Sequence, residues 1–174
     1  LSSSSAASDV YKRQQTYIAS AGIREAEMSG VAARSADKEK NTMNMTWKYK
    51  IDMKNLQAFA DVEKFRGILI PEELKNFVAE HNAATPSRHH FMVGATERVF
   101  GAVLSFEKNE TEADTVYPAL EAVEDKNLLP FAIDPFGNYI CYQLNEKQIV
   151  YWDHENDAVT TTGKSLKEFI ESLY

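Results

Sequence analysis

The spacing of apolar side chains divides the chain near residue 46. Up to that point large apolar residues are few, and those in residues 15–42 form only a weak helical stripe. Beyond it, apolar runs of strand length alternate with apolar positions at helical spacing. We therefore expect residues 1–46 to be a disordered or artefactual lead and residues 47–174 to form a single domain.

The first part of this lead looks foreign to the protein. Residues 1–14 are serine-rich at their start, and they resemble the translated remnant of a sequencing adapter. Met43 and Met45 stand immediately before the change in composition. Our hypothesis is that the natural protein starts at one of these two methionines.

Two helices are predicted early in the domain. Residues 52–64 place apolar side chains at helical spacing, and Gly67 ends this helix. Pro71 suits the first turn of the second helix, because its missing N–H would have no partner there. The second helix should stop near Asn82. The residues at helical spacing in the first helix are Leu56, Phe59, Ala60 and Glu63. The expected buried stripe of the second helix is Leu74, Phe77 and Val78.

Strand patterns fill most of the remaining sequence. Residues 89–106 contain short strands in which Gly101 marks a bulge or a close contact. Residues 107–127 are charged and irregular, and Asp114 could cap one turn of helix within them. An antiparallel meander follows. Its strands are residues 128–133, 139–144 and 148–152, joined by turns at residues 134–138 and 145–147, with residues 158–162 as a fourth, edge strand.

A capping-box pattern predicts the start of the last helix. Ser165 is followed three residues later by Glu168, so that each side chain can satisfy a free backbone N–H of the other residue. Because the strands and the helices are segregated rather than alternating, the pattern predicts an α+β fold.

Composition indicates the cellular compartment that we expect for the protein. Hydrophobic residues make up 44% of the chain, but no run approaches the ~18 apolar residues of a transmembrane helix, so we expect no membrane span. The single cysteine, Cys141, cannot form an intramolecular disulfide, and no secretory signal is recognisable. We therefore expect a cytoplasmic protein in which Cys141 is a small buried hydrophobic residue.

The net charge of −7 is concentrated in the predicted domain. Residues 1–46 hold six Lys/Arg and five Asp/Glu, whereas residues 47–174 hold 13 and 21. An acidic surface repels nucleic acid and anionic lipid and favours a basic protein partner. Ordinary solubility would produce the same charge, so charge alone does not decide between the two interpretations.

Four segments, in order, resemble the SUKH superfamily. Residues 129–142 are similar to its central strands and turn, residues 149–155 to its next strand, residues 166–170 to its closing helix, and residues 70–77 to its early helix. The resemblance covers roughly residues 51–174. It implies a twisted antiparallel β-sheet with helices packed on it and a closing C-terminal helix.

One turn departs from the family pattern. Members of the family usually follow the early helix with Asn-Gly-Gly, whereas this chain has Asn82, Ala83 and Ala84. Alanine resists the positive φ that glycine adopts easily. We therefore expect this loop to be rebuilt.

The family resemblance implies protein binding rather than catalysis. Bacterial members largely act as immunity proteins that block a toxin domain, often a nuclease or a deaminase, and fungal members resemble a cell-wall-synthesis regulator that works through protein partners. We therefore predict an immunity-type protein, with no enzymatic activity, cofactor or metal, that is a monomer or weak dimer and binds a basic toxin domain. The alternatives are a regulatory scaffold, or an enzyme or metal-binding protein that uses Asp134, Asp153 and His154.

Three features supply candidate partner-binding residues. The acidic loop at residues 107–114 would mimic a phosphate backbone and attract a basic toxin, or would simply be a solvated loop. Exposed aromatic residues of the meander would act as anchors, although most of them should belong to the core. The end of the third meander strand would form a polar rim. The predicted residues are Glu107, Glu110, Glu112, Asp114, Asp134, Phe136, Asn138, Tyr142, Trp152, Asp153, His154 and Glu155.

Overall fold

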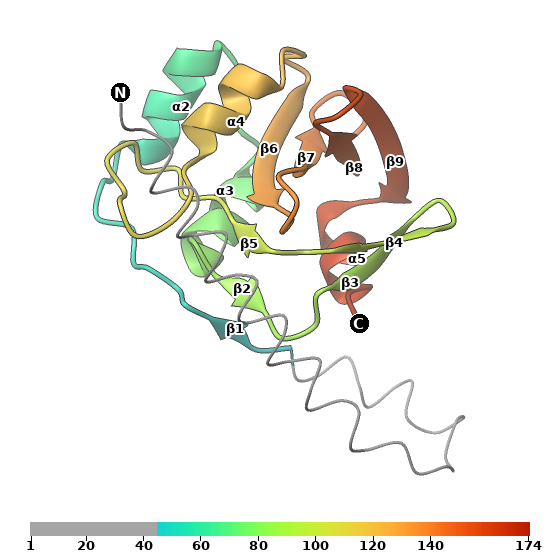
Figure 1. Ribbon diagram of the computed structural model, residues 1–174. Helices are drawn as coiled ribbons and strands as arrows, with labels where there is room; N and C mark the ends of the chain where they lie inside the picture. Colours follow the sequence, from blue (N-terminus) through green and yellow to red (C-terminus); the bar gives the residue numbers. More distant parts are fainter. Residues whose placement is uncertain (1–44) are drawn as a thin grey trace, which may run out of the picture. The chain divides into compact units, whose positions relative to one another are not determined.

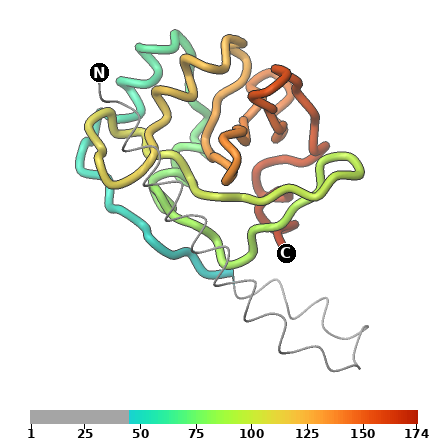
Figure 2. The backbone as a smooth tube through the Cα atoms, viewed as in Figure 1, coloured from blue at the N-terminus to red at the C-terminus, as the bar shows by residue number. Residues whose placement is uncertain are grey.

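The computed structural model describes residues 45–174, and Figure 1 traces them. The predicted disordered or artefactual lead therefore lies almost entirely outside the described residues, as does Met43. Residues Thr46–Tyr174 form one compact unit. Figure 2 shows that this unit begins with an extended segment, which runs along its outside before the first described helix.

The first two described helices end where the sequence predicted. Helix α2 covers Ala58–Arg66, and Gly67 ends it with a positive φ of 72°. Helix α3 covers Glu72–His81 and ends at Asn82. The start of α2 was predicted too early, because residues 52–57 are not helical and Leu56 is 95% exposed.

Five antiparallel strands form the main sheet, in the order β5-β6-β7-β8-β9. In Figure 1 the last four follow one another across the molecule. Neighbours in the sheet are neighbours in sequence, so short turns suffice to connect β6 to β9, as in a meander. The strands are β5 (Ala102–Val103), β6 (Leu128–Ile133), β7 (Tyr139–Gln143), β8 (Gln148–Asp153) and β9 (Ala158–Lys164).

Two smaller pairs complete the strands. Strand β1 (Trp47–Lys48) pairs with β2 (Thr85–Pro86), and β3 (His90–Val93) pairs with β4 (Thr96–Val99). Together with the helices, these sheets confirm the predicted α+β class.

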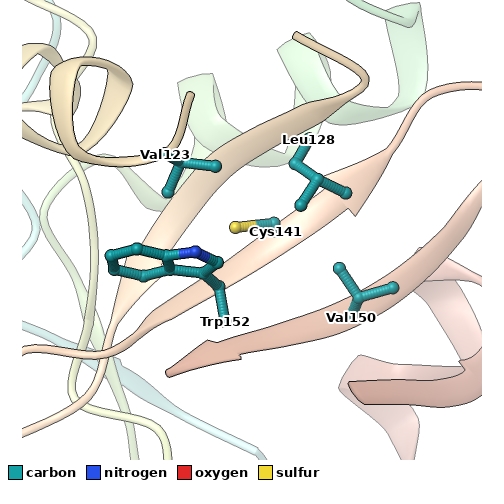
Figure 3. Close-up of a cluster of buried hydrophobic side chains, with 5 residues drawn as sticks. All are labelled: Val123, Leu128, Cys141, Val150 and Trp152. Carbon is teal, nitrogen blue, oxygen red and sulfur yellow. The ribbon is translucent and has the colours of Figure 1, made fainter. Parts of the chain in front are cut away.

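One face of the main sheet packs beneath helices α2 and α4. Helix α4 covers Val116–Ala122. Figure 3 shows Cys141 of β7 among apolar side chains from the neighbouring strands and from the segment that follows α4. Arg66, at the end of α2, donates hydrogen bonds of 2.7 and 2.6 Å to the carbonyl oxygens of Leu120 and Val123. This buried guanidinium therefore satisfies the carboxyl end of α4 and holds the two helices together.

The other face packs against α3, β3 and the closing helix α5 (Leu166–Glu171). Phe77 of α3 meets Phe131 of β6 edge to face at 5.9 Å, and Phe91 of β3 meets Phe169 of α5 at 5.1 Å. The capping box of Ser165 and Glu168 is present, as predicted. With both faces covered, the middle strands carry apolar side chains in succession rather than in strict alternation.

The predicted cap of α4 was wrong. Thr115, not Asp114, precedes the first helical residue, and its side chain makes no capping bond. The helix is instead fixed through the backbone, because Ser105 and Thr115 form a parallel bridge and the Val116 N–H donates to the Ser105 carbonyl oxygen.

The turn after α3 is not rebuilt in the way expected. Ala83 keeps a positive φ of 62°, the left-handed conformation that the family pattern assigns to glycine. Asn82 holds the turn from the other side. Its backbone carbonyl oxygen accepts from the Ile51 N–H at 3.0 Å, and its side-chain amide donates to the Ile51 carbonyl oxygen at 2.9 Å. These contacts are able to hold an alanine in an unfavourable conformation.

Gly101 marks a close contact, one of the two outcomes predicted for it. A Cβ at this position would lie 2.5 Å from the carbonyl oxygen of Ile133 in β6. The absence of a side chain therefore lets the β4–β5 connection approach the edge of the main sheet closely.

An extended segment ties the start of the described unit to α3. Trp47 stacks on the His81 ring at 4.2 Å and meets Phe77 and Phe100 edge to face. Burial lowers the pKa of His81, and the nearby Glu80 carboxylate opposes that shift. We call residues 46–51, which include Trp47 and end at the Ile51 contact with Asn82, the N-terminal strap.

Candidate functional site

Asp134 organises the turn between β6 and β7. The side chain is only 1% exposed. Its Oδ1 accepts from the backbone N–H groups of Phe136 and Asn138 at 2.8 and 2.9 Å. Its Oδ2 accepts from the Asn138 amide at 2.8 Å and from the Tyr151 hydroxyl of β8 at 2.6 Å. Four donors therefore compensate for the burial of this carboxylate.

Asn138 joins this turn to the turn between β8 and β9. Its Oδ1 accepts from the backbone N–H of His154 at 3.0 Å and lies 2.8 Å from Nδ1 of the same residue. Because an amide oxygen only accepts, Nδ1 must carry the proton. The contact fixes the orientation of the imidazole ring. In the neutral ring, Nε2 is then the nitrogen that can accept a hydrogen bond.

The two joined turns carry an exposed aromatic side chain and acidic groups. Phe136 is 60% exposed at the tip of the first turn. Glu155 is exposed on the second turn, and Asp153 is half-buried at its start, where Oδ1 accepts from the Glu155 N–H at 2.9 Å. We call Phe136, Asp153, His154 and Glu155 the turn rim. It combines an apolar anchor with negative charge on a hydrogen-bonded framework.

Trp152 and Tyr142 belong to the interior of the sheet. Trp152 is 6% exposed, and its indole N–H donates to Asp157 Oδ1 at 2.5 Å. Tyr142 is fully buried, and its hydroxyl donates to Glu73 of α3. Burial, reinforced by the Glu73 carboxylate, raises the pKa of the Tyr142 hydroxyl. Both side chains are used within the fold, as are those of Asp134 and Asn138, so we leave these four out of the proposed surface.

The acidic loop divides into a buried and an exposed part. Glu107 is buried, and its Oε1 accepts from the backbone N–H groups of Lys54 and Asn55 just before α2. Asp114 is half-buried, and burial raises the pKa of its carboxyl group. Glu110 bonds to backbone N–H groups of its own loop, including that of Glu112, which is exposed. Only Glu110 and Glu112 remain available to attract a partner.

Each side chain of the metal-binding alternative already has a hydrogen-bond partner within the fold. Asp134 is enclosed by its four donors, while Asp153 and His154 stand at the surface turn. Across residues 45–174, His, Cys, Asp and Glu side chains do not gather in a group of three that could hold a metal ion. Nor does any helix in that range have the length and apolarity to cross a membrane.

Sequence reasoning did not identify Tyr151 or Arg98 as part of this site. The Tyr151 hydroxyl donates a hydrogen bond to Asp134, and the Arg98 guanidinium lies 4.8 Å from the centre of the Tyr151 ring. Tyr151 was one of five aromatic residues of the meander considered as anchors, most of them expected in the core, and Arg98 comes from a distant hairpin. No local signal in the sequence joins the two residues.

Comparison with known proteins gives one family. The family described as SUKH_6, SMI1-KNR4 cell-wall, matches residues 56–170, which cover both the acidic loop and the turn rim. No curated protein matches the chain.

Proposed function

The chain belongs to the SUKH family, and from this membership we propose that it is an immunity-type protein, which neutralises a toxin domain by binding to it. Such a protein acts stoichiometrically, by covering or distorting the active site of the toxin. The family fits either immunity proteins or regulators of the Smi/Knr type. The choice between them therefore rests on the surface of this particular chain.

The turn rim is the observation that carries the proposal. A protein interface commonly gains most of its energy from a few aromatic anchors surrounded by polar groups. Phe136 is an exposed aromatic side chain that can act as such an anchor. The hydrogen bonds of Asp134 and Asn138 fix the conformation of its turn in the free protein. Preorganisation of this kind reduces the entropy lost on binding.

Charge defines the partner that fits this rim. Asp153 and Glu155 belong to the turn that the Asn138–His154 hydrogen bond joins to the turn of Phe136, and the protein as a whole carries a net charge of −7. A toxin domain with a basic surface, as nucleases and other nucleic-acid-directed enzymes have, would be attracted over a distance and then held by the rim. Glu110 and Glu112 of the acidic loop add to this attraction.

Co-expression tests the proposal directly. The toxin domain encoded beside the gene is expressed in bacteria with and without the full chain, and survival is measured. We expect the wild-type chain to restore growth, and Phe136→Ala to weaken toxin binding by about 30-fold, a typical loss for an aromatic hot spot. Restoration of growth without a detectable complex would contradict neutralisation by binding.

Matched controls separate the rim from general surface changes. Glu155→Lys should slow association, whereas Glu146→Lys should have little effect, because Glu146 lies in the β7–β8 turn at the opposite end of the same strands. Phe65→Ala removes another exposed aromatic side chain, from α2, and should leave binding unchanged. Equal losses from the rim and control variants would argue against the rim as the interface.

A regulatory scaffold is the second candidate, because the matching family is described by the words SMI1-KNR4 cell-wall. A scaffold would bind cellular proteins without rescuing cells from any toxin. Affinity purification of the full chain from its native cells, compared with the Phe136→Ala variant, tests this candidate. Loss of the same partners from the variant would support the rim as a regulatory interface.

A further inference from the structure

Strand β9 leaves one edge of the main sheet open. It is the last strand in the order β5-β6-β7-β8-β9, and it pairs with β8 alone among the strands of residues 45–174. Strand β3 lies close to it but belongs to a different sheet. Residues 158–161 are exposed throughout. An open edge presents unpaired backbone groups that can pair with another strand.

The hydrogen bonds of β8 show which groups of β9 face outward. The Ile149 carbonyl oxygen accepts from the Thr162 hydroxyl of β9, so Ile149 faces that strand, and by alternation so does Tyr151. Tyr151 is paired with Thr160. Thr160 therefore bonds inward to β8, and the N–H and C=O groups of Val159 and Thr161 point away from the sheet.

The charges along β9 are arranged so that the strand complements itself. Residues 158–163 contain no charged side chain and consist mostly of Val and Thr, which favour strand pairing. Acidic residues precede this stretch, ending with Asp157, and Lys164 follows it. In an antiparallel pair of identical strands, the acidic end of each lies beside the basic end of the other.

We propose that two copies of this chain associate through their β9 strands, which pair antiparallel about a two-fold axis at Thr160. In this register Val159 of each copy exchanges backbone hydrogen bonds with Thr161 of the other. Beyond this regular part, the acidic turn that ends at Asp157 of each copy lies toward the Lys164 end of the other copy. The interface is isologous, as expected for a closed dimer.

The bulge at the end of β9 limits the strength of this dimer. The β8–β9 register shifts between the Ile149–Lys164 and Val150–Thr161 pairs, so the regular edge is short. Bulges and short edges are devices that restrict edge pairing. The dimer should therefore form at high protein concentration and dissociate on dilution.

Sedimentation equilibrium of the full chain at increasing concentration provides the first test. We expect a reversible monomer–dimer equilibrium. Lys164→Glu removes two ion pairs, one on each side of the axis, and should weaken it by about tenfold. Lys126→Glu, an equal charge change at an exposed site before β6, should not. A monomer at every concentration would overturn the proposal.

Cysteine cross-linking tests the register. Thr160 faces its own copy across the axis as a non-hydrogen-bonded pair, in which side chains approach most closely. Under mild oxidation Thr160→Cys should give a disulfide-linked dimer on a non-reducing gel, whereas Thr96→Cys, exposed on β4, should not. Cys141 is buried and should not interfere. Failure of Thr160→Cys to cross-link in dimeric samples would rule out this register.

Removal of one outward donor completes the test. Thr161→Pro deletes an N–H that faces away from β8, so the ladder between β8 and β9 keeps its bonds while the pairing between copies loses two, one on each side of the axis. We expect this variant to be monomeric, with its folded state verified by circular dichroism. A folded Thr161→Pro variant that still dimerises would show that another surface is responsible.

Discussion

Ala83 holds a backbone conformation that its own side chain opposes. With φ at 62°, the alanine Cβ crowds the neighbouring carbonyl oxygen, at a cost of roughly 1–2 kcal/mol relative to the right-handed conformation. The contacts of Asn82 with the N-terminal strap determine this conformation. The site shows that a turn can hold this conformation without glycine at the position.

Ala83→Gly should therefore stabilise the protein by roughly 0.5–1 kcal/mol, because the relief of strain exceeds the added flexibility of the unfolded chain. Urea unfolding of the two proteins measures the difference. Ala84→Gly is the matched control. Ala84 is fully buried and lacks a positive φ, so its replacement should destabilise the protein. Two losses of equal size would show that Ala83 is not strained.

Asp134 stabilises the β6–β7 turn from inside the protein. Asp134→Asn would turn an amide donor toward the Asn138 amide, which is also a donor, and would leave one of them unsatisfied. We expect a loss of roughly 2–3 kcal/mol in unfolding free energy. Asp153→Asn, at the surface turn, should change stability by less than about 0.5 kcal/mol. Chemical denaturation followed by tryptophan fluorescence measures both.

The N-terminal strap makes stability depend on pH through one histidine. Burial against Trp47 lowers the pKa of His81, whereas in the unfolded chain that pKa is about 6.5. The unfolded state therefore binds the proton more readily. The contribution of the strap is complete above pH ~6.5 and is lost as the pH falls toward the folded-state pKa.

His81→Phe should remove this dependence while preserving the aromatic contact with Trp47. Wild type should lose stability between about pH 7 and pH 5.5, and the variant should lose less over the same interval. Thermal unfolding at a series of pH values gives the comparison. Trp47→Leu, which removes the stacked ring, should also flatten the profile, because the imidazole then becomes hydrated in the folded state.

The order of elements could be predicted from the sequence, because local signals mark most of them. Gly67 ended a helix, Ser165 and Glu168 formed a capping box, and the three turns of the meander separated its strands. Errors arose where tertiary contacts decide. Residues 52–57 have helical spacing, but Glu107 binds the backbone of Lys54 and Asn55 in a non-helical conformation.

The candidate site was predictable only in part. Because both faces of the sheet are covered, its strands lack the alternation of apolar and polar residues that would show which side chains are exposed. Tyr142 and Trp152 have the character of interface residues, yet one contacts α3 and the other lies beneath the segment after α4. Exposure of Phe136 follows from its place at the tip of a turn. The role of Asp134 depends on Tyr151, which arrives from the next strand but one in the sequence.

For the whole molecule, the net charge of −7 should act mainly on the rate of association. Raising the salt concentration from about 0.05 M to about 0.5 M should slow association with a basic toxin domain by roughly tenfold, while dissociation changes little. Stopped-flow mixing measures the two rates separately. A salt-independent association rate would contradict electrostatic attraction. Binding at the turn rim would then depend on shape complementarity and not on charge.

Cys141 allows the rate at which the main sheet opens to be measured. It is the only cysteine in the sequence, its side chain is fully enclosed between strands and the segment after α4, and burial raises the pKa of its thiol. A thiol reagent can reach it only when the middle of the sheet separates. The rate of labelling therefore reports how often the sheet opens, and no cysteine has to be engineered into the protein.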